Sequence, residues 1–188
     1  MSARTFGDST KTNSTGPGRY LLDVTASDVV DLVRSAGGWL FDRSMAGWDV
    51  NVVVTGDGDP RPLHILGVGT SPREPDDDAG APTQLVALAA SAEAVNADSA
   101  LRADVLHAMK RGIGEVLIWG HGRPDGIERG LDVVEHELSS AGRVFKGHAL
   151  AALGLSEAVG PTETFRGRTS LRAYSDLTPA VATSLAQR

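Results

Sequence analysis

One glycine-rich turn is the strongest candidate for chemistry in this sequence. Residues 119–126 read Trp-Gly-His-Gly-Arg-Pro-Asp-Gly and follow the apolar run 115–119, which predicts a buried strand. Glycines at the end of such a strand let the backbone approach an anion, and free N–H groups of a following helix could donate to it. Arg123 could add a bidentate contact, and His121 is an available acid or base. The predicted ligand-binding residues are therefore Gly120, His121, Gly122, Arg123 and Asp125.

The same turn also has a purely structural interpretation. Its spacing, G-x-G-x-x-x-G, is one residue longer than the dinucleotide fingerprint, and no Lys-Ser or Lys-Thr pair makes it a phosphate loop. Glycines that provide turn angles, Pro124 in a first helical turn and Asp125 as a helix cap explain every residue without a ligand. Both interpretations stay open at the level of the sequence.

No metal site or nucleophile is evident from residue spacing. The acidic residues Asp57, Asp59 and 76–78 lack the pattern of a calcium loop. Asp132 and His136 lie four residues apart, which on a helix can hold zinc but is more often a surface hydrogen bond or ion pair. The HExxH and G-x-S-x-G patterns are both absent. We therefore assign no metal, no cofactor and no catalytic residue.

Composition limits the compartment and the partners. The 188 residues carry a formal charge of −6 and no cysteine, which excludes disulfide and thiolate chemistry and disfavours nucleic acid as a partner. No apolar run is long enough to span a membrane, and the polar N-terminus lacks the apolar stretch of a secretory signal. We expect a cytoplasmic protein, and the preference for Arg over Lys, with abundant Ala, indicates a bacterium with a GC-rich genome.

The hydrophobic pattern predicts one α/β domain with flexible ends. We expect a disordered arm at 1–18, the α/β domain at 19–155, and a C-terminal extension at 156–188 that packs on the domain or is partly disordered. The predicted fold is a three-layer sandwich around a small mixed, mostly parallel sheet. Its strands are expected near residues 19, 49, 62, 115 and 170.

Several connections between these strands can also be predicted. A helix should begin near Asp28, kink at Gly37-Gly38 and end at Gly47. The run 62–68 should pair with 49–55 as an antiparallel hairpin, and a surface loop should cover 70–82. Residues 84–90 fit a strand or an Ala-rich helix, and we favour the helix. Further helices are expected at 98–112, at 126–141 and, as a short element, within 144–155.

The pattern favours a non-catalytic function. Because no acid, base, nucleophile or metal set recurs at a recognisable spacing, we expect a domain that binds a protein partner or a small anionic ligand in regulation or assembly. The alternative is an enzyme, or a nucleotide- or phosphate-binding domain, that works at the 120–126 turn. Membrane contact is not expected, and the oligomeric state stays open.

The run 116–118 should be the centre of the core, since only a covered parallel strand is apolar on both faces. Replacing Ile118 by Ala should lower the free energy of unfolding by about 2–5 kcal/mol in denaturant titrations. A loss below roughly 1 kcal/mol would instead place this strand at an edge.

Overall fold

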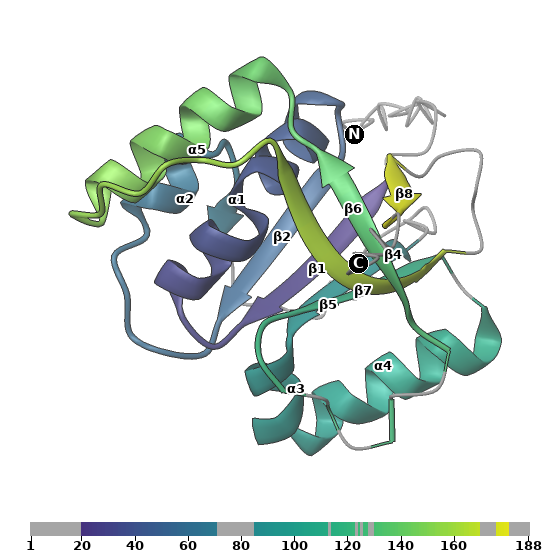
Figure 1. The fold of residues 1–188 in the computed structure, drawn as a ribbon. Helices are drawn as coiled ribbons and strands as arrows, with labels where there is room; N and C mark the ends of the chain where they lie inside the picture. Colours follow the sequence, from purple (N-terminus) through teal and green to yellow (C-terminus); the bar gives the residue numbers. More distant parts are fainter. Residues whose placement is uncertain are drawn as a thin grey trace, which may run out of the picture.

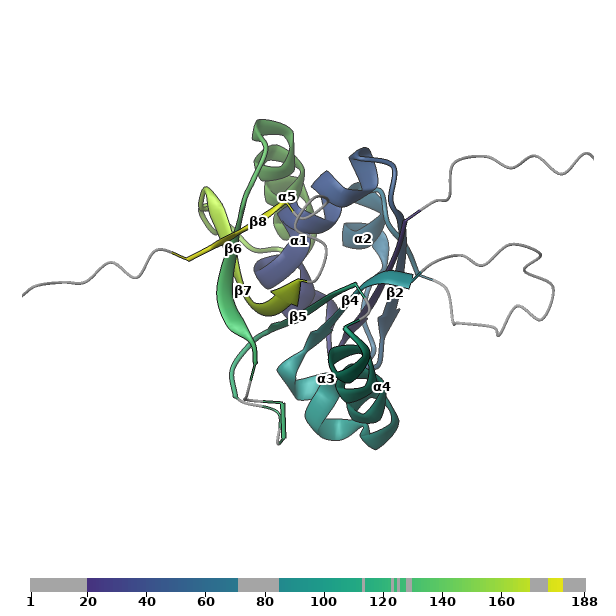
Figure 2. The same cartoon turned by 90° about the vertical axis from the view of Figure 1, so that its right-hand side faces the viewer.

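The computed structural model describes residues 20–70, 85–112, 114–122, 124, 126–127, 130–169 and 176–180. Within them an eight-stranded sheet lies between two layers of helices (Figures 1 and 2). The three-layer α/β sandwich predicted from the sequence is confirmed. The arm at 1–18, the loop beyond Thr70, the strand near 170, and Arg123 and Asp125 of the turn lie outside the described residues.

The sheet has a parallel half and an antiparallel half. The parallel half contains, in spatial order, β3 (Gly69–Thr70), β2 (Asp49–Val54), β1 (Leu21–Ala26), β4 (Leu85–Ser91) and β5 (Glu115–Trp119). It continues, antiparallel, with β7 (Thr162–Thr169), β6 (Asp132–Glu137) and β8 (Leu177–Pro179). The chain builds outward from β1 in both directions, so the order of winding reverses between β1 and β4.

The helices divide between the two faces of the sheet (Figure 2). One face carries α1 (Val29–Met45), α2 (Arg61–Ile65) and α5 (Ser140–Ala152), and the other carries α3 (Ala92–Ala97) and α4 (Ser99–Arg111). Each face has its own cluster of buried apolar side chains, the larger one lying under α1. Ile118 is 3% exposed in the smaller cluster, in agreement with its expected place in the core. None of the described helices is long and apolar enough to cross a membrane.

Local sequence signals account for the ends of two helices. Asp28 is the N-cap of α1, where its carboxylate accepts from the N–H of Asp31 at 2.8 Å. Asp98 caps α4 in the same way, and Gly112 ends it in the left-handed conformation at φ 62°. These ends lie where the sequence predicts them.

Residues 85–91 form a central strand, and our preference for a helix there is wrong. Ala87, Ala89 and Ala90 are at most 1% exposed, because β4 lies between β1 and β5 with helices over both faces. Alanine favours helices in isolation, but pairing on both edges and burial on both faces outweigh that preference here.

The helix expected at 126–141 is also wrong, because residues 132–137 of that range form β6 and α5 begins at Ser140. Gly126 and Gly130 have φ of 84° and 107°, which interrupts a helix. Val134 and His136 then alternate inward with period two and pair with β7. The short helix expected within 144–155 begins earlier, as α5.

The run 62–68 is likewise not a hairpin strand. Pro60 and Pro62 lie at the start of the short helix α2, where the missing N–H of proline costs no hydrogen bond. The chain then returns as β3, which pairs parallel to β2. Residues 162–169, expected in a C-terminal extension, form β7 inside the sheet.

A buried ion pair joins α1, α5 and β7. Lys146 Nζ lies 2.6 Å from Glu163 Oε1 and also donates to the carbonyl of Arg34 at 2.5 Å. Glu163 accepts from the backbone N–H groups of Gly38 and Trp39, at 2.9 and 2.8 Å. In a regular helix the N–H of Gly38 faces the carbonyl of Arg34, so the pair inserts at one rung of the helical ladder. The helix α1 is thus continuous through Gly37-Gly38, without the expected kink, and the Lys146–Glu163 pair contacts its backbone there.

Burial raises the pKa of the Glu163 carboxyl, while Lys146 and the two N–H groups oppose that rise. Lys146→Met should therefore lower the free energy of unfolding by about 3–5 kcal/mol in denaturant titrations, since it leaves a buried carboxylate without its cation. The same change at the exposed Lys110 should stay within about 0.5 kcal/mol. Adding Glu163→Gln to Lys146→Met should recover part of the loss, and additive effects of the two changes would contradict the proposed coupling.

Candidate functional site

The reversal of winding between β1 and β4 marks the first place to look for a site. In open α/β sheets, ligands bind outside the carboxyl ends of parallel strands where the order reverses. Here β1 ends at Ala26 and is followed by Ser27, while β4 ends at Ser91 and leads into α3. The strands of the parallel half bring these two ends side by side.

Hydrogen bonds join the two strand ends. The backbone N–H of Ser27 donates to Ser91 Oγ at 3.2 Å, and Ser27 Oγ donates to Glu93 Oε2 at 3.1 Å across 66 residues of sequence. Ser91 is buried and also caps α3 by accepting from the N–H of Ala94. The Ser27 hydroxyl is therefore held beside the exposed carboxylate of Glu93. The sequence analysis missed the pairing of Ser27 with Glu93. Recognising residues 85–91 as a strand would have placed Glu93 at the same edge of the sheet as Ser27.

The end of β5 adds a third group to this edge. The indole N–H of Trp119 donates to Asp31 Oδ2 at 2.7 Å, and Ser35 Oγ donates to Asp31 Oδ1 at 3.2 Å. Trp119 is 2% exposed, so its donor is satisfied inside the protein. These bonds fix the first turns of α1 against β5.

The predicted turn lies beside the same strand ends. A β-carbon built on Gly120 would lie 3.8 Å from the amide nitrogen of Ala92, at the start of α3. Gly120 and Gly122 have φ of 91° and 97°, conformations that require glycine. His121 is exposed, and Arg166 Nη1 donates to the carbonyl of Gly122 at 3.3 Å.

The structure removes one argument for an anion at this turn. Residues 132–137 form a strand, and the next described helix begins only at Ser140. Among the described residues after the turn, there is thus no helix N-terminus to donate the expected N–H groups. A ligand site at Gly120, His121 and Gly122 stays a prediction.

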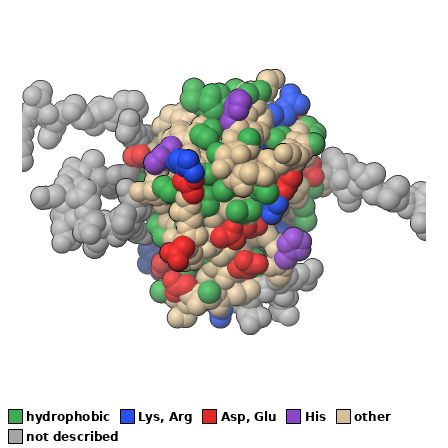
Figure 3. All heavy atoms as spheres, turned by 90° about the vertical axis from the view of Figure 1, so that its left-hand side faces the viewer, with side chains coloured by type: hydrophobic (Ala, Val, Ile, Leu, Met, Phe, Trp, Pro, Cys, Tyr) green, Lys and Arg blue, Asp and Glu red, His purple; other side chains and the backbone are tan. Residues whose placement is uncertain are grey.

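The surrounding surface is acidic. Figure 3 shows the face toward which the arrowheads of β1 and β2 point in Figure 1, and acidic side chains gather in its lower half. Asp28, Asp57 and Glu93 each follow the carboxyl end of a parallel strand. Such a field disfavours phosphates and other anionic ligands.

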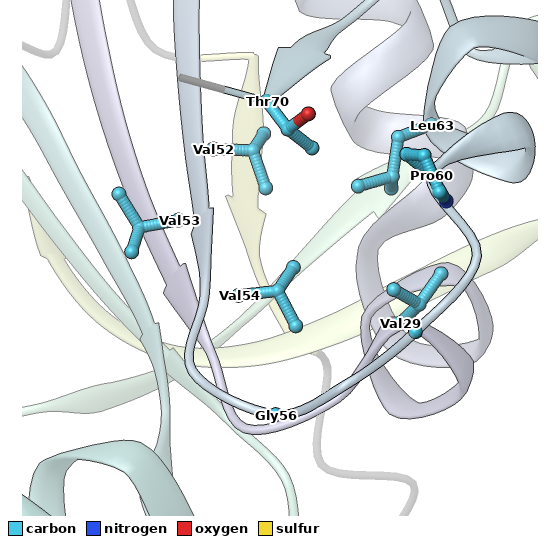
Figure 4. A pocket seen from close by; sticks show the side chains of 9 residues that line it. Val29, Val52, Val53, Val54, Gly56, Pro60, Leu63 and Thr70 are labelled. Atoms are coloured by element: carbon cyan, nitrogen blue, oxygen red, sulfur yellow. The ribbon is translucent and has the colours of Figure 1, made fainter. Parts of the chain in front are cut away.

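A cavity of about 390 Å³ lies next to this edge, between β2, α2 and the start of α1 (Figure 4). Its lining residues are Val29, Val52, Val53, Val54, Gly56, Gly58, Pro60, Leu63 and Thr70. The N–H of Gly56 donates to the carbonyl of Ser27 at 3.0 Å, and Val29 directly follows the helix cap Asp28. The cavity wall and the strand-end residues thus share one stretch of backbone.

A second polar cluster lies at the other end of α1. His136 Nε2 lies 2.9 Å from Asp42 Oδ2 and His136 Nδ1 lies 3.3 Å from Asp176 Oδ2. Asp42 also accepts from the N–H and Oγ of Ser139, at 3.0 and 2.5 Å. These side chains line an open groove of about 680 Å³. Both carboxylate oxygens of Asp42 thus take part in contacts within the protein, and these contacts join α1, β6 and the start of α5.

The structure also separates Asp132 from His136. On a strand, residues four apart are separated by about 13 Å, so the two do not form the pair expected on a helix. Among the described residues, no group of three His, Asp or Glu side chains could hold a metal ion.

Comparisons with known proteins concern the fold. No protein-family model matches the sequence, and no curated protein matches it significantly. A solved antimicrobial pseudoaglycone deacetylase is 16% identical with a TM-score of 0.48, over 81% of this chain and 98% of that one. The zinc-inhibited form of a teicoplanin deacetylase is 13% identical with a TM-score of 0.49, over 87% of this chain and 100% of that one. A conserved protein from Thermus thermophilus is 12% identical with a TM-score of 0.37.

The function expected from the sequence differs from the functions of these solved structures. We expected a non-catalytic domain that binds a protein partner or a small ligand in regulation or assembly, whereas the solved structures are described as deacetylases, which are enzymes. We do not retain the non-catalytic expectation. The likeness brings neither substrate nor catalytic residues to this chain.

Asp42→Ala should lower the free energy of unfolding by about 1.5–3 kcal/mol, because His136 and Ser139 lose a charged acceptor. Denaturant titration measures the effect. Asp132→Ala is the matched control on the exposed start of β6 and should stay within about 0.5 kcal/mol. Equal effects of the two substitutions would refute a structural role for the Asp42 cluster.

Proposed function

We propose that the chain is an enzyme that hydrolyses an uncharged ester or amide of a small molecule at the carboxyl ends of β1, β4 and β5. The observation that carries this proposal is the bond between Ser27 Oγ and Glu93 Oε2, which places a hydroxyl and a carboxylate together where the sheet changes its order. Carboxylates and imidazoles are the usual groups that move protons in such reactions.

Each side chain has a distinct role in this proposal. The exposed Glu93 accepts a proton from the attacking water, and Ser27 holds the Glu93 carboxylate in place. His121, on the neighbouring turn, donates a proton to the leaving alcohol or amine. Gly120 and Gly122 allow the backbone of the turn to approach the substrate closely.

A nucleotide- or phosphate-binding function has less support. No helix N-terminus follows the turn in the part of the chain that the structure describes before Ser140, and carboxylates gather at the edge. Arg166 is the described cation at the turn, and its guanidinium already donates to Gly122. A small uncharged substrate therefore fits the edge better than the anionic ligand first expected. The cytoplasmic location of the protein stays a prediction.

A screen of chromogenic esters and amides should reveal turnover that depends on Glu93 and His121. Glu93→Gln and His121→Asn should each lower kcat by about 10²- to 10⁴-fold, since each removes a group that transfers a proton. Because both side chains are exposed, the melting temperatures should stay close to that of the unmodified protein.

Matched controls lie far from this edge in the sequence and at the surface. Glu157→Gln and His148→Asn change exposed side chains of the same types and should keep full kcat. Turnover that Glu93→Gln and His121→Asn leave unchanged would sink the proposal. A shift in melting temperature with phosphate or nucleotides, abolished by Arg166→Ala, would favour an anion site instead.

A further inference from the structure

The described side chains that line the cavity beside the strand ends are mostly apolar. Six of its nine lining residues are valine, proline or leucine, and Thr70 supplies the hydroxyl among them. Among the residues that the structure describes, no Lys, Arg, Asp or Glu lines the cavity. In Figure 4, Val52, Val54 and Leu63 point into the space, while Val53 turns away from it. An occupant of this cavity would exchange no ion pair with its walls and would gain mainly from burial of apolar surface.

The walls of the cavity are stiff. Valine has few accessible rotamers and proline fixes its own backbone, so neither closes the space readily. A β-carbon built on Gly58 would lie 2.8 Å from Val29 Cγ2, and one built on Gly56 would lie 2.5 Å from the carbonyl oxygen of Ser27. Glycine at both positions lets the loop run close to α1 while Val54 and Leu63 face each other across open space. A volume of about 390 Å³ is within the range of small-molecule sites.

The position of the cavity ties it to the strand ends. Val29 is the first residue of α1, directly after Asp28, and Gly56 binds the carbonyl of Ser27. A ligand body held against Val29 and Val54 therefore lies next to the backbone that carries the Ser27 hydroxyl. A polar group on that ligand can extend toward the carboxyl edge.

We infer that this cavity binds a neutral aliphatic chain, and that the substrate is an uncharged compound that carries such a chain next to its reacting group. That the bound compound is a substrate rests on the proposed hydrolysis, whereas the binding of an aliphatic chain in the cavity does not depend on catalysis. The described walls are apolar and carry no charged side chain, which favours an alkyl or acyl chain over a sugar, a nucleotide or an ammonium group.

Calorimetric titration with butanamide, hexanamide and octanamide tests the inference directly. Each added methylene should tighten binding by about fourfold until the cavity is full, because each buries further apolar surface. Val54→Phe fills the space and should remove this dependence on chain length. Val54→Ala enlarges it and should move the optimum to a longer amide, so the test survives if the phenylalanine variant fails to fold.

The control is Val133→Phe, the same change at a valine of β6 that is 49% exposed, which should leave the titrations unchanged. Glu93→Gln should keep amide binding whatever it does to turnover, which separates this inference from the proposed reaction. Affinities that do not depend on chain length, or that Val54→Phe leaves unaltered, would overturn it. A change in elution volume with Val54→Phe and no amide binding would assign the cavity to contact with a second copy, and would also overturn it.

Discussion

The Lys146–Glu163 pair is the interaction on which the arrangement of this molecule depends most. Transferring two charges into a protein interior is costly, and such a pair persists only when further hydrogen bonds satisfy both groups. Here the additional partners are backbone groups of α1 itself, the carbonyl of Arg34 and the N–H groups of Gly38 and Trp39. The pair therefore fixes the height and rotation of α1 relative to β7 and α5, which packing of apolar side chains alone does not specify.

The glycines of α1 follow from this constraint. A β-carbon on Gly38 would lie 2.5 Å from Leu138 Cδ2, so the chain after β6 can approach α1 only where α1 has no side chain. Glycine inside a helix costs about 1 kcal/mol relative to alanine. Leu138 and the carboxylate of Glu163 both contact α1 at Gly38, which has no side chain. Together these contacts offset the cost of the glycine. A pair of glycines can kink a helix, but here it allows a buried ion pair to contact the backbone of a continuous helix.

Both ends of α1 are fixed independently of its middle. At its start, Asp28 caps the helix and Asp31 accepts from Trp119, which sets the helix relative to the carboxyl ends of the strands. At its end, Arg43 contacts Glu115 at 2.7 Å and lies 4.0 Å from the ring centroid of Trp48. One helix thus connects the candidate site, the buried pair and the groove at His136, and its rigidity positions Ser27 and Val29.

The sequence allowed prediction of the elements whose local preferences agree with their environment. The strands at 49–54 and 115–119 and the ends of α4 have unambiguous signals, and the structure agrees with them. The strand β4 escaped because alanine carries no β preference, and only its place between β1 and β5 makes it a strand. The sequence analysis missed β6 because residues 127, 131, 134 and 138 recur at helical spacing, whereas the residues that alternate inward in the strand are Val134 and the polar His136.

The same reasoning explains which part of the candidate site could be predicted from the sequence. The turn at 120–122 is continuous in sequence, so its glycines and histidine stood out, whereas Ser27 and Glu93 meet only because β4 returns beside β1. Proximity of this kind is a property of topology and has no local signature. It also changes the chemistry expected of the turn, since an isolated glycine loop followed by a helix favours an anion, while this loop lies at the end of β5 next to β4, on a sheet edge that also carries Glu93, Asp28 and Asp57. The surroundings contributed by β1, β2 and β4, more than the turn itself, therefore make this edge unfavourable for an anionic ligand.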